Sequence, residues 1–188
     1  MPNRFRTLHI FRPGRSMPPH PCNVHYLRNV LAGSVLAGGT PPVSRKTKPK
    51  RIFLSRAKIG TRLAINADEF EQFLREHDFS TVDMAELTVV QQRAMFADVD
   101  VVLGALGSDL LAVYFAPPQC TVISMQCDMD SDRCAPPTAV ILGMKHQFLV
   151  CTNSRPSKHA RNTLDRDFVV DCGELSRRLR EIDAAPSE

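Results

Sequence analysis

A glycine turn inside an apolar stretch is the part of the sequence best suited to bind a ligand. Residues 101–118 read VVLGALGSDLLAVYFAPP, a strand-like run that breaks at Gly104 and Gly107 and resumes at helical spacing from Ser108. Glycine lets the backbone approach a ligand closely, and Ser108 can cap a helix whose free N–H groups favour an anion. The pattern predicts a strand, a loop of phosphate size and a helix.

A second candidate loop is basic. The loop expected after the first regular strand carries Arg56, Lys58 and Arg62. Ligands of parallel sheets bind beyond the carboxyl ends of the strands, where this loop is expected to meet loops 83–87 and 104–109. Arginine binds phosphate oxygens through paired hydrogen bonds. The residues alone leave two interpretations open, a diphosphate site facing the glycine turn or a solvated surface loop.

Alternating strand and helix patterns position these loops. Strands are expected at 51–55, 79–82, 100–104, 120–125, 147–151 and 167–171. Helices are expected at 23–37, from Asn66 onward, and at 88–96, 109–115, 138–144 and 173–182. Such alternation implies parallel strands joined by right-handed crossovers. We therefore expect an α/β, Rossmann-like fold, with a mostly parallel sheet and helices on both faces.

Charge and proline divide the chain unequally. Residues 1–50 hold eight of the fourteen prolines, and residues 1–56 contain eleven Lys or Arg and no acid. We expect a partly irregular basic leader at 1–50, a Rossmann-like domain at 51–183 and a tail at 184–188. Clustered positive charge could bind an anionic membrane, an acidic substrate or nucleic acid, or could simply be solvated. Aromatic residues for base stacking are not interleaved, so no specific nucleic acid is expected.

The remaining composition argues against several classes of protein. No apolar run reaches the roughly 18 residues that cross a bilayer, and the start lacks the design of a secretory signal, although it has some likeness to an organelle transit peptide. We expect a cytoplasmic protein that could lie peripherally on a membrane. The six cysteines are interpreted as reduced structural thiols. The gap between Cys127 and Cys134 lacks a second ligand pair, so no metal site is expected.

Several short motifs occur together in one order. They are Ser55-Arg56, Arg62-x-x-x-Asn66, Glu69, Asp78-Phe79, Ala85-Glu86-Leu87, Gln91 or Gln92, Gly104-Ala-Leu-Gly-Ser-Asp-Leu110, Phe115-Ala-Pro-Pro118 and the ending at 167–179. Together they resemble glycosyltransferase family 61, a domain long associated with capsular polysaccharide biosynthesis. The resemblance covers about residues 50–180.

This resemblance implies the second, nucleotide-sugar lobe of a B-type glycosyltransferase in a shortened form. It implies inverting transfer of a hexosyl or pentosyl group in polysaccharide or glycan biosynthesis, from a sugar-nucleotide donor such as a UDP-sugar to a glycan acceptor, without a cofactor or required metal. Among the matching positions, Arg56 and Arg62 would neutralise the leaving diphosphate. The others assigned to nucleotide-sugar binding are Glu86 near the base or ribose, Gly104, Gly107 and the Ser108 N–H around the diphosphate, and Asp109 toward a sugar hydroxyl or as a helix cap.

Three places depart from the family pattern. Leu106 stands where the family has a histidine, Ala112 stands where it has an asparagine, and Ser108-Asp109 replaces the usual small pair. Most of a first lobe also lacks a counterpart, and no catalytic base is assigned. The alternative is therefore a non-catalytic nucleotide-binding or assembly remnant, with a separate first lobe as a further candidate partner. A redox nucleotide enzyme is disfavoured, because no G-x-G-x-x-G follows a first strand.

Overall fold

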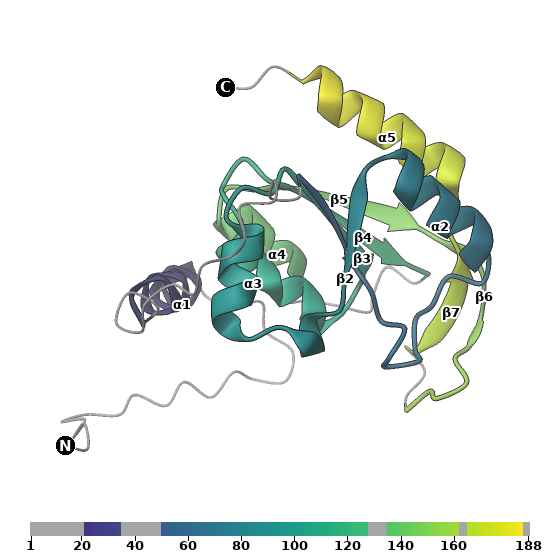
Figure 1. The fold of residues 1–188 in the computed structure, drawn as a ribbon, viewed down its shortest axis with the longest axis horizontal. Coiled ribbons are helices and arrows are strands. Elements are labelled where there is room, and N and C mark those ends of the chain that lie inside the picture. Colours follow the sequence, from purple (N-terminus) through teal and green to yellow (C-terminus); the bar gives the residue numbers. More distant parts are fainter. Residues whose placement is uncertain (1–20, 35–49, 128–134, 162–164, 186–188) are drawn as a thin grey trace.

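The computed structural model describes residues 21–34, 50–127, 135–161 and 165–185 (Figure 1). Its main sheet has five strands in the order β2-β1-β3-β4-β5, and every neighbouring pair is parallel. The strands are β1 (Arg51–Leu54), β2 (Phe79–Val82), β3 (Val101–Ala105), β4 (Thr121–Gln126) and β5 (Lys145–Val150). The expected Rossmann-like α/β fold is confirmed.

Helices cover both faces of the sheet. They are α1 (Pro21–Ser34), α2 (Ala67–Glu76), the 3₁₀ turn η1 (Met84–Glu86), α3 (Val89–Phe96), the 3₁₀ helix η2 (Ser108–Phe115), α4 (Ala135–Ile141) and α5 (Cys172–Ala184). α2 and α5 lie on one face, and α1, α3 and α4 lie on the other (Figure 1). None of the helices in the described part of the chain is long and apolar enough to span a membrane.

Each face of the sheet has its own apolar core. Ile52 and Leu54 of β1 point to the side of α3, η2 and α4, whereas Phe53 packs on the side of α2. Strands β3 and β4 are buried along their whole length, as expected for central strands of a parallel sheet that is covered on both faces. The α2 face is closed by Phe70, Phe73 and Leu74, which recur at helical spacing and are buried.

The structure corrects three expectations. The segment after the glycine turn forms a 3₁₀ helix, and its N-cap is Gly107 rather than Ser108, with no side-chain cap bond. The segment expected to form the last sheet strand is β7 (Arg166–Val169), which pairs antiparallel with the unexpected β6 (Thr152–Pro156) in a separate ribbon. The strict alternation therefore stops at β5, because the polar stretch that follows it turns directly into β6.

Helix α1 belongs to the leader, which was expected to be partly irregular and to contain one helix at 23–37. It starts and ends a few residues before the expected helix, and the fully buried Val24 joins the core beside η2 and α4. The other leader residues, 1–20 and 35–49, and tail residues 186–188 lie outside the described part of the chain. Among the described residues, Cys120, Cys127, Cys151 and Cys172 are free thiols, whereas Cys134 lies outside them.

Candidate functional site

The loops that leave β1 and β3 meet where the strand order reverses. β1 and β3 are neighbours, but the chain turns outward from β1 to β2 before it returns to β3. At such a switch point the loops diverge to opposite faces and leave a crevice, which is the usual ligand position in an open α/β sheet. Residues 55–66 and the turn before η2 therefore form the candidate site.

Arg56 lies just after β1 and is held by Asp109. Its Nη1 donates a hydrogen bond to Asp109 Oδ2, and its Nε donates to the Thr61 carbonyl at 3.3 Å. The Arg56 side chain is only 10% exposed. Burial lowers the pKa of Arg56 from its usual value; Asp109 acts against this shift and Arg62 adds to it. The guanidinium is thus a largely desolvated cation that depends on a nearby anion.

Arg62 approaches the same turn from the other end of the loop. Its backbone has a φ of 61°, in the left-handed region, and its Nη1 donates to the Leu106 carbonyl. Its Nε and Nη2 donate to Asp165 Oδ1 at 3.2 and 3.1 Å. The N–H of Arg161 donates to Asp165 and is the leading reason why the pKa of this carboxyl is lowered from its ordinary value, with Arg62 contributing in the same direction.

The two glycines of the turn have different roles. A Cβ on Gly107 would lie 2.8 Å from Arg62 Nη1 and 3.1 Å from Arg56 Nη1, so the absence of a side chain lets both guanidinium groups reach the turn. A Cβ on Gly104 would instead meet Leu54 Cβ at 3.2 Å and Leu110 Cδ2 at 3.3 Å. Gly104 is therefore a packing residue inside β3. Of the two glycines, Gly107 is the one that faces the arginines of the loop.

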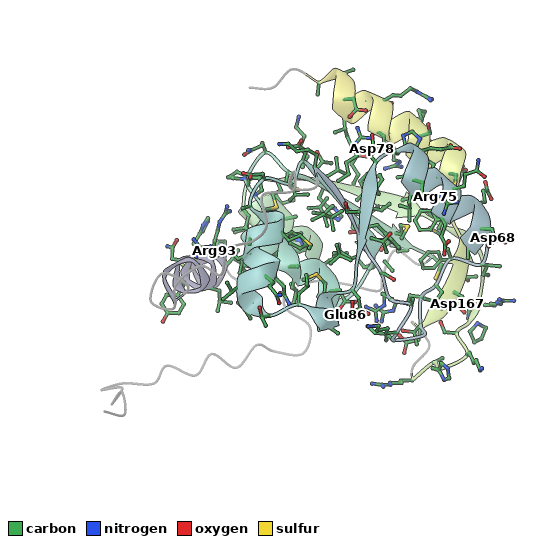
Figure 2. All side chains as sticks on the ribbon, viewed as in Figure 1. Asp68, Arg75, Asp78, Glu86, Arg93 and Asp167 are labelled. Atoms are coloured by element: carbon green, nitrogen blue, oxygen red, sulfur yellow. The ribbon has the colours of Figure 1, made fainter. Side chains whose placement is uncertain are left out.

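The remaining predicted residues lie at the rim of the site. Ser108 is exposed at the first position of η2, and its N–H has no acceptor within the helix. Glu86 of η1 pairs with Lys58, and both side chains are about 60% exposed. Such a solvated pair contributes little to stability. Figure 2 shows Glu86 and Asp167 at the same edge of the molecule.

The loop that carries Arg62 is fastened to the C-terminal ribbon. Leu63 and Ile65 exchange backbone hydrogen bonds with Phe168, and Ala64 forms a parallel bridge with it. The Asn66 side chain accepts from the Val170 N–H and donates to the Val170 carbonyl, each at 2.9 Å. Asn66 is the N-cap residue of α2 but makes no side-chain cap bond, so its amide joins the loop to the ribbon instead.

A buried serine and aspartate complete this attachment. Ser157 Oγ accepts from the Arg62 N–H at 3.1 Å and donates to Asp167 Oδ1 at 2.6 Å. Asp167 Oδ1 also accepts from the Leu63 N–H at 3.0 Å. The sequence analysis missed the roles of Ser157, Asp165 and Asp167. Ser157 and Asp165 follow β5 in a polar stretch that matches no motif, and Asp167 was expected only as the first residue of the terminal strand.

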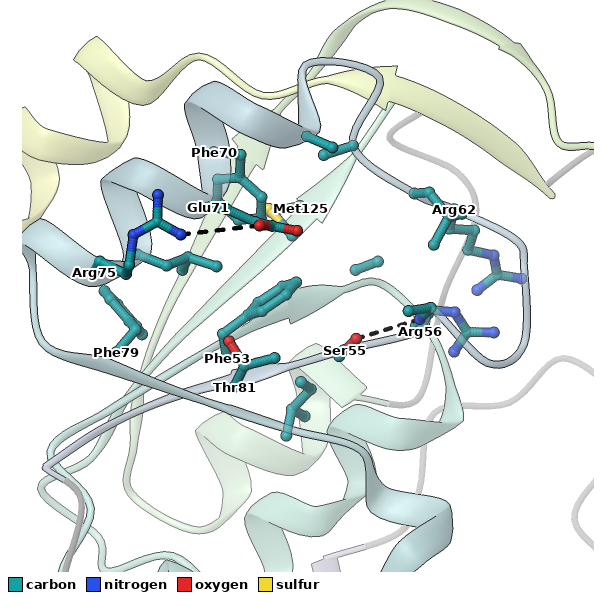
Figure 3. Close-up of a pocket in the computed structure, with 17 residues that line it drawn as sticks. Phe53, Ser55, Arg56, Arg62, Phe70, Glu71, Arg75, Phe79, Thr81 and Met125 are labelled. Carbon is teal, nitrogen blue, oxygen red and sulfur yellow. Dashed lines mark hydrogen bonds and ion pairs between the residues drawn. The ribbon is translucent and has the colours of Figure 1, made fainter.

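A cavity of about 380 Å³ adjoins the arginines on the α2 face (Figure 3). It is lined by Phe53, Leu54, Ser55, Arg56, Ala57, Arg62, Leu63, Ala64, Ala67, Phe70, Glu71, Leu74, Arg75, Phe79, Thr81, Ala105 and Met125. Arg56 and Arg62 lie at one end, and the ion pair of Arg75 with Glu71, 3.9 Å long, lies at the other. Phe53 meets Phe70 edge to face with ring centroids 5.1 Å apart. The cavity is thus mainly apolar with charged ends.

The sheet, with arginines and a glycine turn at its switch point, defines a Rossmann-like domain with a candidate anion site. The chain belongs to the glycosyltransferase 61 family, whose model matches residues 6–123. No curated protein matches the chain. The family match includes much of the leader and ends within β4, so it begins and ends earlier than the resemblance at 50–180. Arg56, Arg62 and Gly107 lie inside it, and Asp165 lies outside.

The acidic side chains of the site are not arranged as metal ligands. In the part of the chain that the structure describes, no group of three or more His, Cys, Asp or Glu side chains could hold a metal ion. Asp109 and Asp165 contact separate arginines rather than sharing one point. The charges in the site are therefore balanced by side chains of the chain itself.

Proposed function

We propose that this chain binds the sugar-nucleotide donor of an inverting glycosyl transfer, with a UDP-sugar as the preferred candidate. The observation that carries the proposal is the convergence of Arg56 and Arg62 on Gly107 at the switch point, all within the segment matched by the family. The diphosphate lies against these two guanidinium groups and the N–H groups that open η2. Arginine suits phosphate oxygens because its planar donors form paired, charge-assisted hydrogen bonds.

The proposed chemistry uses this charge on the leaving group. The bond from the acceptor oxygen to the anomeric carbon forms while the bond from that carbon to the diphosphate oxygen breaks. Negative charge then grows on the departing nucleoside diphosphate, where fixed positive groups lower the barrier. The acceptor hydroxyl gives its proton to a base, which we leave unassigned in this chain.

We place the nucleoside in the cavity on the α2 face. A volume of about 380 Å³ lies within the usual range of small-molecule pockets, which are mostly apolar with a few orienting polar groups. The cavity begins at Arg56 and Arg62, so a flat base between α2 and the sheet would extend directly from the diphosphate. Glu86, on the other side of the β1 loop and paired with Lys58, is then a rim residue.

A non-catalytic binding role is the second candidate, and Leu106 favours it. Its side chain is 3% exposed within the apolar core, and its carbonyl is already bonded to Arg62. The position where the family has a histidine therefore offers no polar ring to a donor. In this role the chain would bind the nucleotide and associate with a first lobe or an anionic membrane surface in the cytoplasm.

Calorimetric titration of the full chain with UDP tests the donor site. We expect binding that is lost in the double variant Arg56→Ala, Arg62→Ala, because the diphosphate then has no guanidinium partner. Arg180→Ala is the matched control, since Arg180 is an exposed arginine that bonds to Ser176 on α5. Absence of heat at millimolar UDP from the folded wild-type chain would contradict the proposal, and hydrolysis or transfer of a UDP-sugar would contradict the purely binding role.

A further inference from the structure

We propose that the two carboxylates of the site act in opposite directions on diphosphate binding. Asp165 is a positioning residue that holds Arg62 ready for the ligand, whereas Asp109 competes with the ligand for Arg56. The inference rests on the proposed function, because it concerns the diphosphate part of the same site. It also extends that function to β6–β7, a region beyond the residues matched by the family.

Asp165 grips the side of Arg62 that faces away from the turn. Its Oδ1 accepts from Nε and Nη2, while Nη1 remains directed at the Leu106 carbonyl and the Gly107 position. The Asp165 side chain is 7% exposed, and its other oxygen accepts from the Arg161 N–H at 3.0 Å. A carboxylate bonded on both oxygens and buried in this way fixes the plane of the guanidinium.

The backbone of Arg62 is fixed by the same ribbon. The Arg62 N–H donates to Ser157 Oγ, which in turn donates to Asp167. These bonds hold the backbone of a non-glycine residue at a φ of 61°, a conformation that costs energy unless the surroundings enforce it. The backbone and the guanidinium of Arg62 are therefore both positioned by residues within and between β6 and β7.

Asp109 differs in position and in accessibility. It is the second residue of η2, and its side chain is 21% exposed, three times the fraction of Asp165. Its Oδ2 bonds to Nη1 of Arg56, the same nitrogen that approaches the Gly107 turn. A phosphate oxygen that uses this nitrogen must replace the Asp109 carboxylate, which also occupies the first turn of the helix where an anion is favoured.

The two roles can be separated experimentally, because charge alone predicts the same change in affinity for both residues. Removing either carboxylate charge near a bound anion relieves Coulomb repulsion and should strengthen binding. Positioning predicts the reverse for Asp165, because Arg62 without its carboxylate is free to leave the turn. A weaker Kd after removal of a negative charge therefore identifies positioning.

The experiment titrates the full chain with UDP, inorganic pyrophosphate and uridine by calorimetry. We expect Asp109→Asn to tighten UDP binding by about tenfold and Asp165→Asn to weaken it by about tenfold, the scale of one charge-assisted hydrogen bond. Uridine affinity should stay unchanged in both, which a general loss of structure would not allow. Asp183→Asn is the matched control, since Asp183 is a half-exposed acid that pairs with Arg51 at 2.5 Å.

A conservative variant covers the case in which Asp165→Asn fails to fold. Asp165→Glu keeps the charge but shifts the carboxylate, so positioning predicts weaker UDP binding and charge alone predicts no change. The inference is overturned if a folded Asp165 variant binds UDP as tightly as the wild type or more tightly. It is also overturned if Asp109→Asn does not raise the affinity for UDP. In both cases, UDP binding by the wild type still supports the donor site. If the folded wild type binds neither UDP nor pyrophosphate, the donor-site proposal fails, and the inference that rests on it fails with it.

Discussion

At the scale of single residues, the charges of the site are compensated within the chain. Arg56 and Arg62 read as a positive loop in the sequence, but each guanidinium is paired with one carboxylate in the fold. The pairing permits two arginines to lie close together at a buried turn, where unpaired charges would be costly. In the proposed donor site, the diphosphate would therefore exchange with the Asp109 carboxylate rather than fill an empty positive pocket.

The two glycines of the turn give a prediction at the same scale. We expect Gly107→Ala to weaken UDP binding by tenfold or more and to reduce stability less than affinity, because the new methyl group displaces the guanidinium ends of Arg62 and Arg56 and meets no backbone atom. We expect Gly104→Ala to destabilise the fold by about 1–3 kcal/mol through overpacking against Leu54 and Leu110. Urea unfolding and UDP calorimetry on both variants measure the two effects.

Each glycine variant is the control for the other. Loss of stability in Gly107→Ala with unchanged UDP affinity would show that the turn serves packing and not the ligand. A Gly104→Ala chain as stable as the wild type would show that β1 can move away from the added methyl group.

The site residues that the sequence predicted are those that directly follow a recognisable strand. Arg56, Arg62 and Gly107 were identified because they follow strands whose apolar periodicity is clear and whose carboxyl ends must meet. Asp165 was missed because its partner Arg62 is 103 residues away in the chain. Its own surroundings are polar and match no element pattern, so neither periodicity nor motif spacing indicates the contact.

At the scale of elements, the β6–β7 ribbon acts as the support of the β1 loop. Residues 63–65 lie along β7 and share backbone bonds with Phe168. The main sheet could be predicted because its central strands are buried and mainly apolar. The segments between strands carry apolar residues at helical spacing or clear caps, such as the capping box of Thr88 and Gln91. The ribbon could not, because β6 is polar and carries no alternation of apolar residues that would indicate a strand.

Asn66 provides the test of this attachment. We expect Asn66→Ala to lower the free energy of unfolding by about 1–3 kcal/mol, because both hydrogen bonds to the Val170 backbone are lost and leave partly buried polar groups without partners. UDP affinity should fall as well, since the loop then holds Arg62 less firmly. Urea unfolding and calorimetry of the same variant measure both quantities.

Gln72→Ala is the matched control for Asn66. Gln72 is an exposed side chain on α2 that bonds to Glu76, and such surface pairs change stability by less than about 0.5 kcal/mol. An Asn66→Ala chain that behaves like Gln72→Ala in unfolding would rule out the attachment as a source of stability.

At the scale of the whole molecule, the folded unit is longer than the family match. The match ends at residue 123, yet the core on the α2 face is completed by Phe168, Val170, Leu175 and Leu179, each at most 2% exposed. Burial of such side chains contributes roughly 1.5–3 kcal/mol each. The residues after β5 are thus part of the same cooperative structure as the site.

Truncation at the end of β5 tests whether the residues after β5 unfold cooperatively with the rest of the domain. We expect a chain ending at Val150 to lose its cooperative unfolding transition and its UDP binding, because the loss of β7 and α5 uncovers one face of the central strands and removes Asp165. A chain ending at Ala185, one residue past α5, is the control and should unfold like the full chain. Leu175→Ala supplies a milder change, since this fully buried residue should cost about 2–5 kcal/mol in urea unfolding. Cooperative unfolding of the 1–150 chain with the free energy of the full chain would show that the family-matched part folds and holds its arginines without the ribbon.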